Sequence, residues 1–100
     1  HFAERGRFGR LLGAVAHNPR LLGVGIDEDT AIVVEGDSFR VIGSGGVTIV
    51  DGHRITHSNI ADAEPDRVLS LFDVTLHVLG AGDRFDIARR RPQAFSKDDP

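Results

Sequence analysis

The first residues of the chain carry side chains typical of an active site. His1 is followed by Arg5, Arg7 and Arg10 within the run HFAERGRFGR. A free terminus is usually poorly ordered and is seldom rich in residues of this kind. We therefore expect the run to lie in the interior of a longer protein, with part of an active site upstream of His1.

Glu28 is the carboxylate that a common topology would bring to His1. If a strand ends at His1, a right-handed crossover through a helix leads to a parallel strand at 21–26. Sites in such sheets form at the carboxyl ends of the strands, so His1 and Glu28 would lie side by side. A carboxylate beside a histidine fixes its tautomer and stabilises the imidazolium, which makes a general base for a nucleophile. Alternatively, Glu28 is a loop carboxylate within an acidic cluster.

Three arginines gather at the beginning of the predicted helix. A helix start carries positive partial charge, so Arg5 and Arg7 each cost about 0.3–1 kcal/mol there. Arg5 falls at the edge of the apolar stripe and points partly inward, so it needs an anionic partner. With Arg10, these residues form either a cradle for carboxylates or phosphates, or a solvated basic face paired with nearby acidic residues.

The elements that must position these side chains are one helix followed by several strands. Apolar residues at spacings of three and four predict a helix over 4–17, and Asn18-Pro19 ends it. Residues 21–26 form a short apolar run with glycines, typical of a buried parallel strand. Alternating or β-rich runs predict the further strands, at 30–35, 38–43, 47–50 and 73–79.

The connections between these strands are predicted from turn residues. Gly36-Asp37 and 80–83 are expected to be turns, and Gly43-Ser44-Gly45-Gly46 is expected to be a hairpin turn. The glycine run lacks the lysine and helix of a phosphate loop. Asp51-Gly52 is a strong hairpin signal that leads towards 54–58. The segment 65–72 fits either a short helical turn or a loop, and 89–100 is expected to be a frayed tail.

Composition limits the class of protein. One hundred residues, 40% of them hydrophobic, suit one small domain or half of a larger one. The sequence has no Trp, Tyr or Cys, so we expect an aliphatic core and no disulfide, thiolate metal site or cysteine nucleophile. The net charge of −3 gives no bulk attraction to nucleic acid or anionic membranes. His53 and His57 lie four residues apart in strand-like surroundings, about 13 Å along a strand, which argues against a shared metal.

Several motifs occur together along the chain. They are His1-Phe2, Arg5, Arg7, Gly9-Arg10-Leu11, the run Gly23-Val24-Gly25-Ile26-Asp27-Glu28, and Thr30-Ala31. This pattern resembles the cyanophycinases, serine-type exopeptidases related to aspartyl dipeptidases. The later runs RVIGSGGVTIVDG and DVTLHVLGAGDRFD also look like the C-terminal part of that family. The resemblance covers nearly the whole chain, and its first 36 residues carry the specific motifs.

The resemblance implies a fold and a reaction. The fold would be α/β, the C-terminal part of a three-layer α/β/α sandwich. The family hydrolyses cyanophycin, a poly-aspartate carrying arginine on its side-chain carboxyls, to β-aspartyl-arginine dipeptides by means of a serine, a histidine and a glutamate. His1 matches the catalytic histidine, Glu28 the triad acid, and Arg5, Arg7 and Arg10 the basic residues of the substrate pocket. The resemblance also implies a homodimer that needs no metal and no other cofactor.

One part of the family pattern is absent from these residues. The serine lies upstream in the family, so residues 1–100 would be the C-terminal half of a peptidase domain, inactive without the N-terminal half. One alternative is a non-enzymatic α/β fragment that keeps the scaffold as an anion-binding module. Another is a dipeptidase for other acidic peptides. The compartment, cytoplasmic or secreted, is left open by the sequence.

Overall fold

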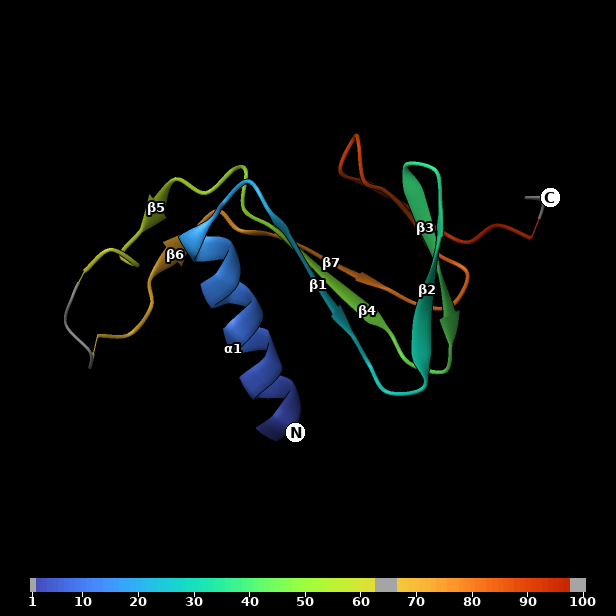
Figure 1. The fold of residues 1–100 in the computed structure, drawn as a ribbon, viewed down its shortest axis with the longest axis horizontal. Coiled ribbons are helices and arrows are strands. Elements are labelled where there is room, and N and C mark those ends of the chain that lie inside the picture. The colour runs from blue at the N-terminus through green and yellow to red at the C-terminus, as the bar shows by residue number, and fades with distance from the viewer. Residues whose placement is uncertain (1, 63–66, 98–100) are drawn as a thin grey trace. The chain divides into compact units, whose positions relative to one another are not determined.

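The computed structural model describes residues 2–62 and 67–97, and their side chains from Arg7 onward. Within these residues one helix precedes all of the strands, as the sequence predicts (Figure 1). In chain order the elements are α1 (Phe2–His17), β1 (Leu22–Ile26), β2 (Thr30–Glu35), β3 (Ser38–Gly43), β4 (Val47–Asp51), β5 (His57–Ser58), β6 (Leu71–Phe72), β7 (Thr75–Leu79), β8 (Arg84–Asp86) and β9 (Arg91–Gln93).

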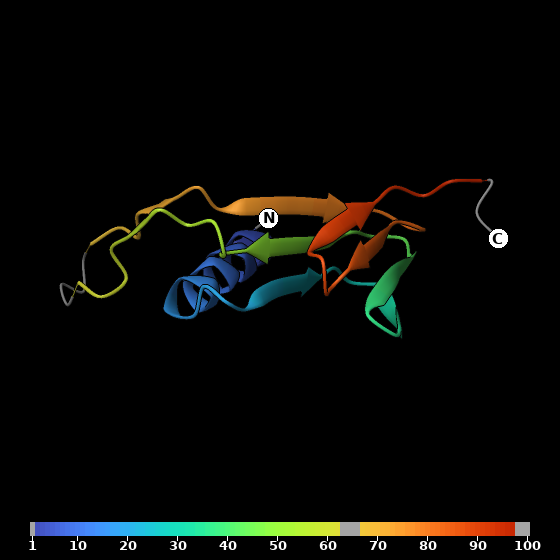
Figure 2. The ribbon, with the colours of Figure 1, turned by 90° about the horizontal axis from the view of Figure 1, so that it is seen from above.

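The chain divides into two units. Unit 1 comprises His1–Gly25 and Ile49–Leu76, and unit 2 comprises Ile26–Thr48 and His77–Pro100. Strands β1, β4 and β7 form a sheet in the order β1-β4-β7, and the division between the units falls within each of these strands. Figure 2 shows β4 running in the opposite direction to both of its neighbours.

In unit 1, helix α1 packs closely against β1. The helix ends at His17 because Asn18 precedes proline and avoids helical angles. A Cβ placed on Gly23 would lie 2.7 Å from Leu11 Cδ1 and 3.0 Å from Val15 Cγ2. Because glycine has no side chain, the helix can approach the strand at this point. Val15 is 1% exposed and is one of the largest fully buried side chains.

The turn after β4 also packs closely against the end of α1 in unit 1. A Cβ on Gly52 would lie 2.5 Å from Val15 Cγ1 and 3.1 Å from the Cα of Pro19. The hairpin predicted at Asp51-Gly52 is wrong, because β5 pairs with β6 rather than with β4. Gly52 is buried against the helix end, and Asp51 uses its carboxylate to hold the following turn. The residues that signal a hairpin therefore serve tertiary packing instead.

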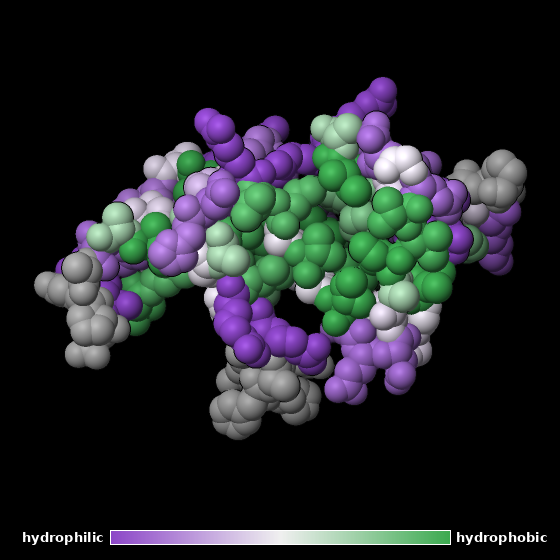
Figure 3. Space-filling model, in the orientation of Figure 1, coloured by the Kyte–Doolittle hydropathy of each residue, from purple (hydrophilic) through white to green (hydrophobic). Residues whose placement is uncertain are grey.

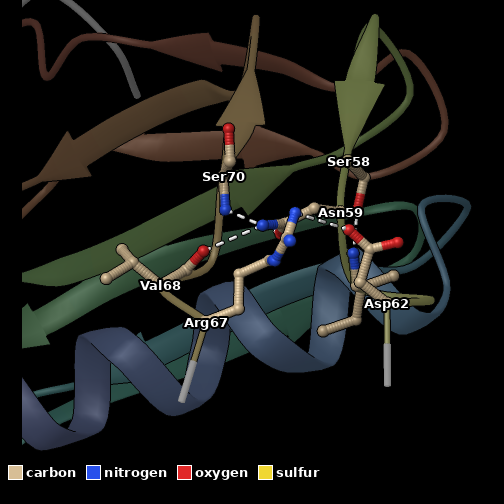
Figure 4. Close-up of polar contacts among 7 residues, drawn as sticks. Ser58, Asn59, Asp62, Arg67, Val68 and Ser70 are labelled. Atoms are coloured by element: carbon tan, nitrogen blue, oxygen red, sulfur yellow. Dashed lines mark hydrogen bonds and ion pairs between the residues drawn. The ribbon is translucent and has the colours of Figure 1, made fainter. Parts of the chain in front are cut away.

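The connection between β5 and β6 is organised by Asn59 (Figure 4). Its side-chain amide donates to the carbonyl of Val68 at 2.8 Å, and its side-chain oxygen accepts from the amide of Ser70 at 2.8 Å. Arg67 and Asp62 form an exposed ion pair of 3.1 Å in the same connection. The ambiguous segment 65–72 thus ends in a short strand, and 65–66 lie outside the described residues.

Unit 2 is built on the antiparallel sheet β2-β3-β8-β9. A two-residue turn joins β2 to β3, with Glu35 opposite Ser38 and Gly36 at φ 61°, as Gly36-Asp37 predicts. The rings of Phe39 and Phe85 stack at 5.7 Å. The expected aliphatic core is therefore supplemented by aromatic rings. The buried hydrophobic side chains of this unit are Phe39, Val41, Val47, Leu79 and Phe85.

Strand β1 differs from the buried parallel strand that its apolar run predicts. Its hydrogen-bonded neighbour is β4, and it stands at one edge of its sheet. Val24 is 36% exposed and Ile26 is 39% exposed. A buried parallel strand needs cover on both faces, whereas among the described residues the cover comes from α1 at Gly23. Pairing between β1 and a strand that precedes the helix stays a prediction.

Two other expectations differ from the structure. The run Gly43–Gly46 is not a hairpin turn, because β3 and β4 belong to different sheets and the run connects them. The segment 89–100, expected to be frayed, contains β9, which pairs with β8 in the register Arg84 opposite Gln93. Proline is tolerated in β9 because this strand lies at the edge of its sheet.

Candidate active site

The predicted site residues are distributed over the two units. His1 lies outside the described residues, and so does the side chain of Arg5, whose backbone belongs to α1. Arg7 and Arg10 are exposed on α1, one helical turn apart. Glu28 lies in unit 2, in the turn between β1 and β2. The structure thus brings Arg7 and Arg10 together on one helix, and the contact between His1 and Glu28 stays a prediction.

The turn that carries Glu28 is tied to the glycine run Gly43–Gly46. The amide of Asp27 donates to the carbonyl of Gly46 at 3.1 Å, and the amide of Gly46 donates back to Asp27 Oδ2 at 3.0 Å. The amide of Ser44 donates to the carbonyl of Asp29 at 3.0 Å. The residues on both sides of Glu28 are therefore hydrogen-bonded to the same neighbouring loop.

Thr30 completes this connection with its hydroxyl. Thr30 Oγ1 donates to the carbonyl of Glu28 at 2.9 Å and accepts from the amide of Gly45 at 2.9 Å. A hydroxyl can do both because it carries one donor and two acceptor lone pairs. Asp29 has φ 54°, a left-handed conformation that asparagine and aspartate tolerate better than most residues. The backbone of the acidic turn is thus held at several consecutive positions.

The carboxylate of Glu28 faces solvent at the tip of this turn. Glu28 is exposed, and within the part of the chain that the structure describes its carboxylate has no hydrogen bond or ion pair. Its turn follows the carboxyl end of β1, the edge where sequence reasoning places a site. The Glu28 carboxylate is thus a charged hydrogen-bond acceptor on an anchored backbone, and a cationic or hydrogen-bond-donating partner can reach it.

A second carboxylate–histidine pair was missed by sequence reasoning. Asp51 is buried, with its side chain 1% exposed, and its Oδ1 accepts from His53 Nδ1 at 2.9 Å and from the His53 amide at 3.0 Å. The His53 side chain is 48% exposed. The sequence signal is Asp-x-His, in which aspartate bonds to a backbone amide two residues on. This geometry fixes the imidazole of His53 and closes the turn after β4.

The described residues contain no group of three or more His, Cys, Asp or Glu side chains placed to hold a metal ion. Within the same part of the chain, α1 is too short and too polar to cross a membrane.

The curated proteins that resemble this chain in sequence carry the same name. No family model matches the chain. It is 43% identical over 95 residues to a cyanophycinase of Geminocystis herdmanii, with 94% of this chain and 35% of that protein covered. It is 46% identical over 91 residues to a cyanophycinase of Trichormus variabilis, covering 90% of this chain and 30% of that protein.

A cyanophycinase of Synechococcus elongatus is 40% identical over 94 residues, with 93% of this chain and 29% of that protein covered. The chain thus spans about a third of the length of the curated relatives it matches. Nine-tenths of the chain align with proteins of one name, which confirms the resemblance drawn from its motifs. Over almost its whole length, this chain is homologous to a portion of the cyanophycinases.

Proposed function

We propose that this chain is part of a serine-type peptidase that hydrolyses cyanophycin to β-aspartyl-arginine dipeptides. The observation that carries the proposal is the combination of cyanophycinase relatives at 40–46% identity with an anchored, solvent-facing Glu28. In this proposal His1 is the general base and Glu28 is the acid that orients it. The nucleophilic serine belongs to the remaining length that the relatives have and this chain lacks.

The proposed chemistry follows the general logic of a catalytic triad. The serine Oγ attacks the carbonyl carbon of the scissile amide while His1 takes the hydroxyl proton. His1 then gives this proton to the leaving amine, the C–N bond breaks and an acyl-enzyme remains. Water then attacks the acyl carbonyl while His1 takes one of its protons. His1 returns this proton to the serine Oγ as the acyl C–O bond breaks, which releases the acid product and regenerates the serine. Glu28 holds the imidazole tautomer and stabilises the imidazolium formed in each half of the cycle.

The arginines of α1 would bind the substrate. Cyanophycin ends in a free carboxylate, and guanidinium groups bind carboxylates through two parallel hydrogen bonds. Arg7 and Arg10 are exposed on α1, which supports this role, and Arg5 belongs to the same proposed set. A substrate anion would also offset the cost of placing positive charge at the helix start.

The proposed fold of the full-length protein is a three-layer α/β/α sandwich, of which this chain forms the C-terminal part. Among the described residues, strand β1 stands at the edge of its sheet, where a parallel neighbour could pair with it. Exposed apolar side chains also remain on the strands, and Figure 3 shows hydrophobic residues open to view on one face. A preceding strand would pair with β1, and further helices would cover such surface. The complete protein is proposed to act as a homodimer.

The test is hydrolysis of cyanophycin by the full-length protein that contains this segment. Chromatography should detect β-aspartyl-arginine as the product. We expect Glu28→Gln to lower kcat by about a hundredfold or more, because the neutral amide no longer stabilises the imidazolium. Glu35→Gln is the matched control, since Glu35 is an exposed glutamate of the same unit with an ion pair of 3.7 Å to Arg40.

Other outcomes separate the alternatives. Binding of cyanophycin without cleavage would favour an anion-binding module. Cleavage of small aspartyl dipeptides in preference to cyanophycin would favour a dipeptidase. Equal activity of Glu28→Gln and Glu35→Gln would contradict the assignment of Glu28.

A further inference from the structure

The glycine run Gly43–Gly46 lies outside the motifs to which the proposed reaction gives a role. Its backbone nevertheless contacts the acidic turn on both sides of Glu28. An exposed turn of consecutive acidic residues would by itself be mobile, because its side chains bury little surface and its charges repel. The hydrogen bonds to the glycine run oppose that mobility.

We infer that this run, acting through Asp27 and Thr30, is the element that positions the Glu28 carboxylate for catalysis. The inference rests on the proposed function and extends it. Asp27 and Thr30 would be positioning residues, because they act on Glu28 through the backbone and need not touch substrate. Neither has a role in the chemistry described above.

Thr30 is the centre of the arrangement. Its hydroxyl donates to the Glu28 carbonyl and accepts from the Gly45 amide. It therefore links Glu28 directly to the glycine run. Valine has nearly the same shape and can form neither bond, whereas serine keeps the hydroxyl and can form both. Thr30 therefore offers a pair of substitutions that separate the hydrogen bonds from the volume of the side chain.

The glycines permit this close approach. A Cβ on Gly45 would lie 2.6 Å from Thr30 Oγ1 and 2.8 Å from the Cβ of Asp27. A Cβ on Gly43 would lie 2.2 Å from the Asp29 carbonyl oxygen, and Gly43 has φ 109°. Any side chain at either position would push the acidic turn away, so two loops distant in sequence depend on each other for their conformation.

The consequence is a preorganised backbone beneath the Glu28 carboxylate. A triad acid acts only if its oxygen lies within hydrogen-bond distance of the imidazole, and a misplacement of about 1 Å can cost about a hundredfold in rate. By analogy with hydrogen bonds that orient the ligands of metal sites, whose loss costs about tenfold to a hundredfold in activity, we expect a similar loss when this turn is released. The loss on releasing this turn should appear in kcat, because ground-state binding of substrate does not need the triad acid.

The experiment compares single variants in the full-length protein with cyanophycin as substrate. We expect Thr30→Val to lower kcat by about tenfold to a hundredfold with KM changed less than about threefold. Thr30→Ser should return kcat to within about threefold of the parent, because its hydroxyl restores both bonds. Thr48→Val is the matched control, since Thr48 is a half-buried threonine on β4 of the same unit.

Gly45→Ala tests the same contact from the other loop and should also lower kcat. Thermal denaturation and elution volume establish that each variant is folded.

The inference is overturned if Thr30→Val keeps more than half of the parent kcat, if Thr30→Ser is as impaired as Thr30→Val, or if Thr48→Val loses as much. Glu28→Gln separates the inference from the proposed role of Glu28: if this variant is fully active, that role is wrong and the inference, which rests on it, fails as well. If Glu28→Gln is inactive while Thr30→Val is normal, the inference alone fails.

Discussion

Individual carboxylates in this chain have different roles that depend on their surroundings. Glu28 is exposed on an anchored turn, where its charge remains available to a partner. Asp51 is buried, and its carboxylate accepts hydrogen bonds from the amide and the ring of His53. The exposed Glu28 carboxylate can bind a reacting partner. The Asp51 carboxylate stabilises the fold, because a buried carboxylate must be hydrogen-bonded within the protein. Both have a histidine partner, proposed in one case and observed in the other.

Replacing Asp51 should affect stability rather than substrate turnover. We expect Asp51→Ala to lower the free energy of unfolding by about 1–3 kcal/mol, because the hydrogen bonds that close the turn after β4 are lost. Asp62→Ala is the comparison, since Asp62 forms an exposed ion pair with Arg67 and such pairs contribute about 0–1 kcal/mol. Urea denaturation of the full-length variants measures both changes. Equal losses for Asp51→Ala and Asp62→Ala would contradict the structural role of Asp51.

At the scale of elements, glycines determine how α1 and β1 approach each other. Gly23 faces Leu11 and Val15 at distances that leave no room for a Cβ, whereas nothing lies within 4 Å of a Cβ on Gly13. We expect Gly23→Ala to destabilise the protein by about 1–3 kcal/mol through overpacking. Gly13→Ala should stabilise it by about 0.5–1 kcal/mol, because alanine is the better helix former. Thermal denaturation should give shifts of opposite sign, and shifts of equal sign would contradict this packing.

Local sequence signals predicted the elements better than their pairing. Apolar spacing located α1, and β-rich runs located β2, β3 and β4 to within a residue, because these signals act between near neighbours. Turn residues predicted hairpins at 43–46 and 51–52 that the structure does not form. These segments adopt their positions through contacts with Thr30 and Val15, which are distant in sequence. Topology and resemblance singled out Glu28 as a candidate, and its catalytic role stays a prediction; the loop hydrogen-bonded to its turn became visible only in the structure.

At the scale of the whole molecule, the exposed apolar side chains are the main unexplained surface. Leu76 is 48% exposed and Val78 is 72% exposed on β7, and Val24 is 36% exposed on β1. Large exposed apolar areas are uncommon in monomeric proteins and usually mark an interface. The relatives are about three times as long as this chain, and we propose that a segment corresponding to their remaining length covers these strands.

Val78→Thr should therefore have opposite effects in two contexts. In the isolated 100-residue segment it removes exposed apolar surface, so light scattering should show less self-association than in the unsubstituted segment. In the full-length protein the same hydroxyl would be buried without a partner, and the free energy of unfolding should fall by about 1–3 kcal/mol. An unchanged stability of the full-length variant would mean that β7 stays open to solvent in the complete protein.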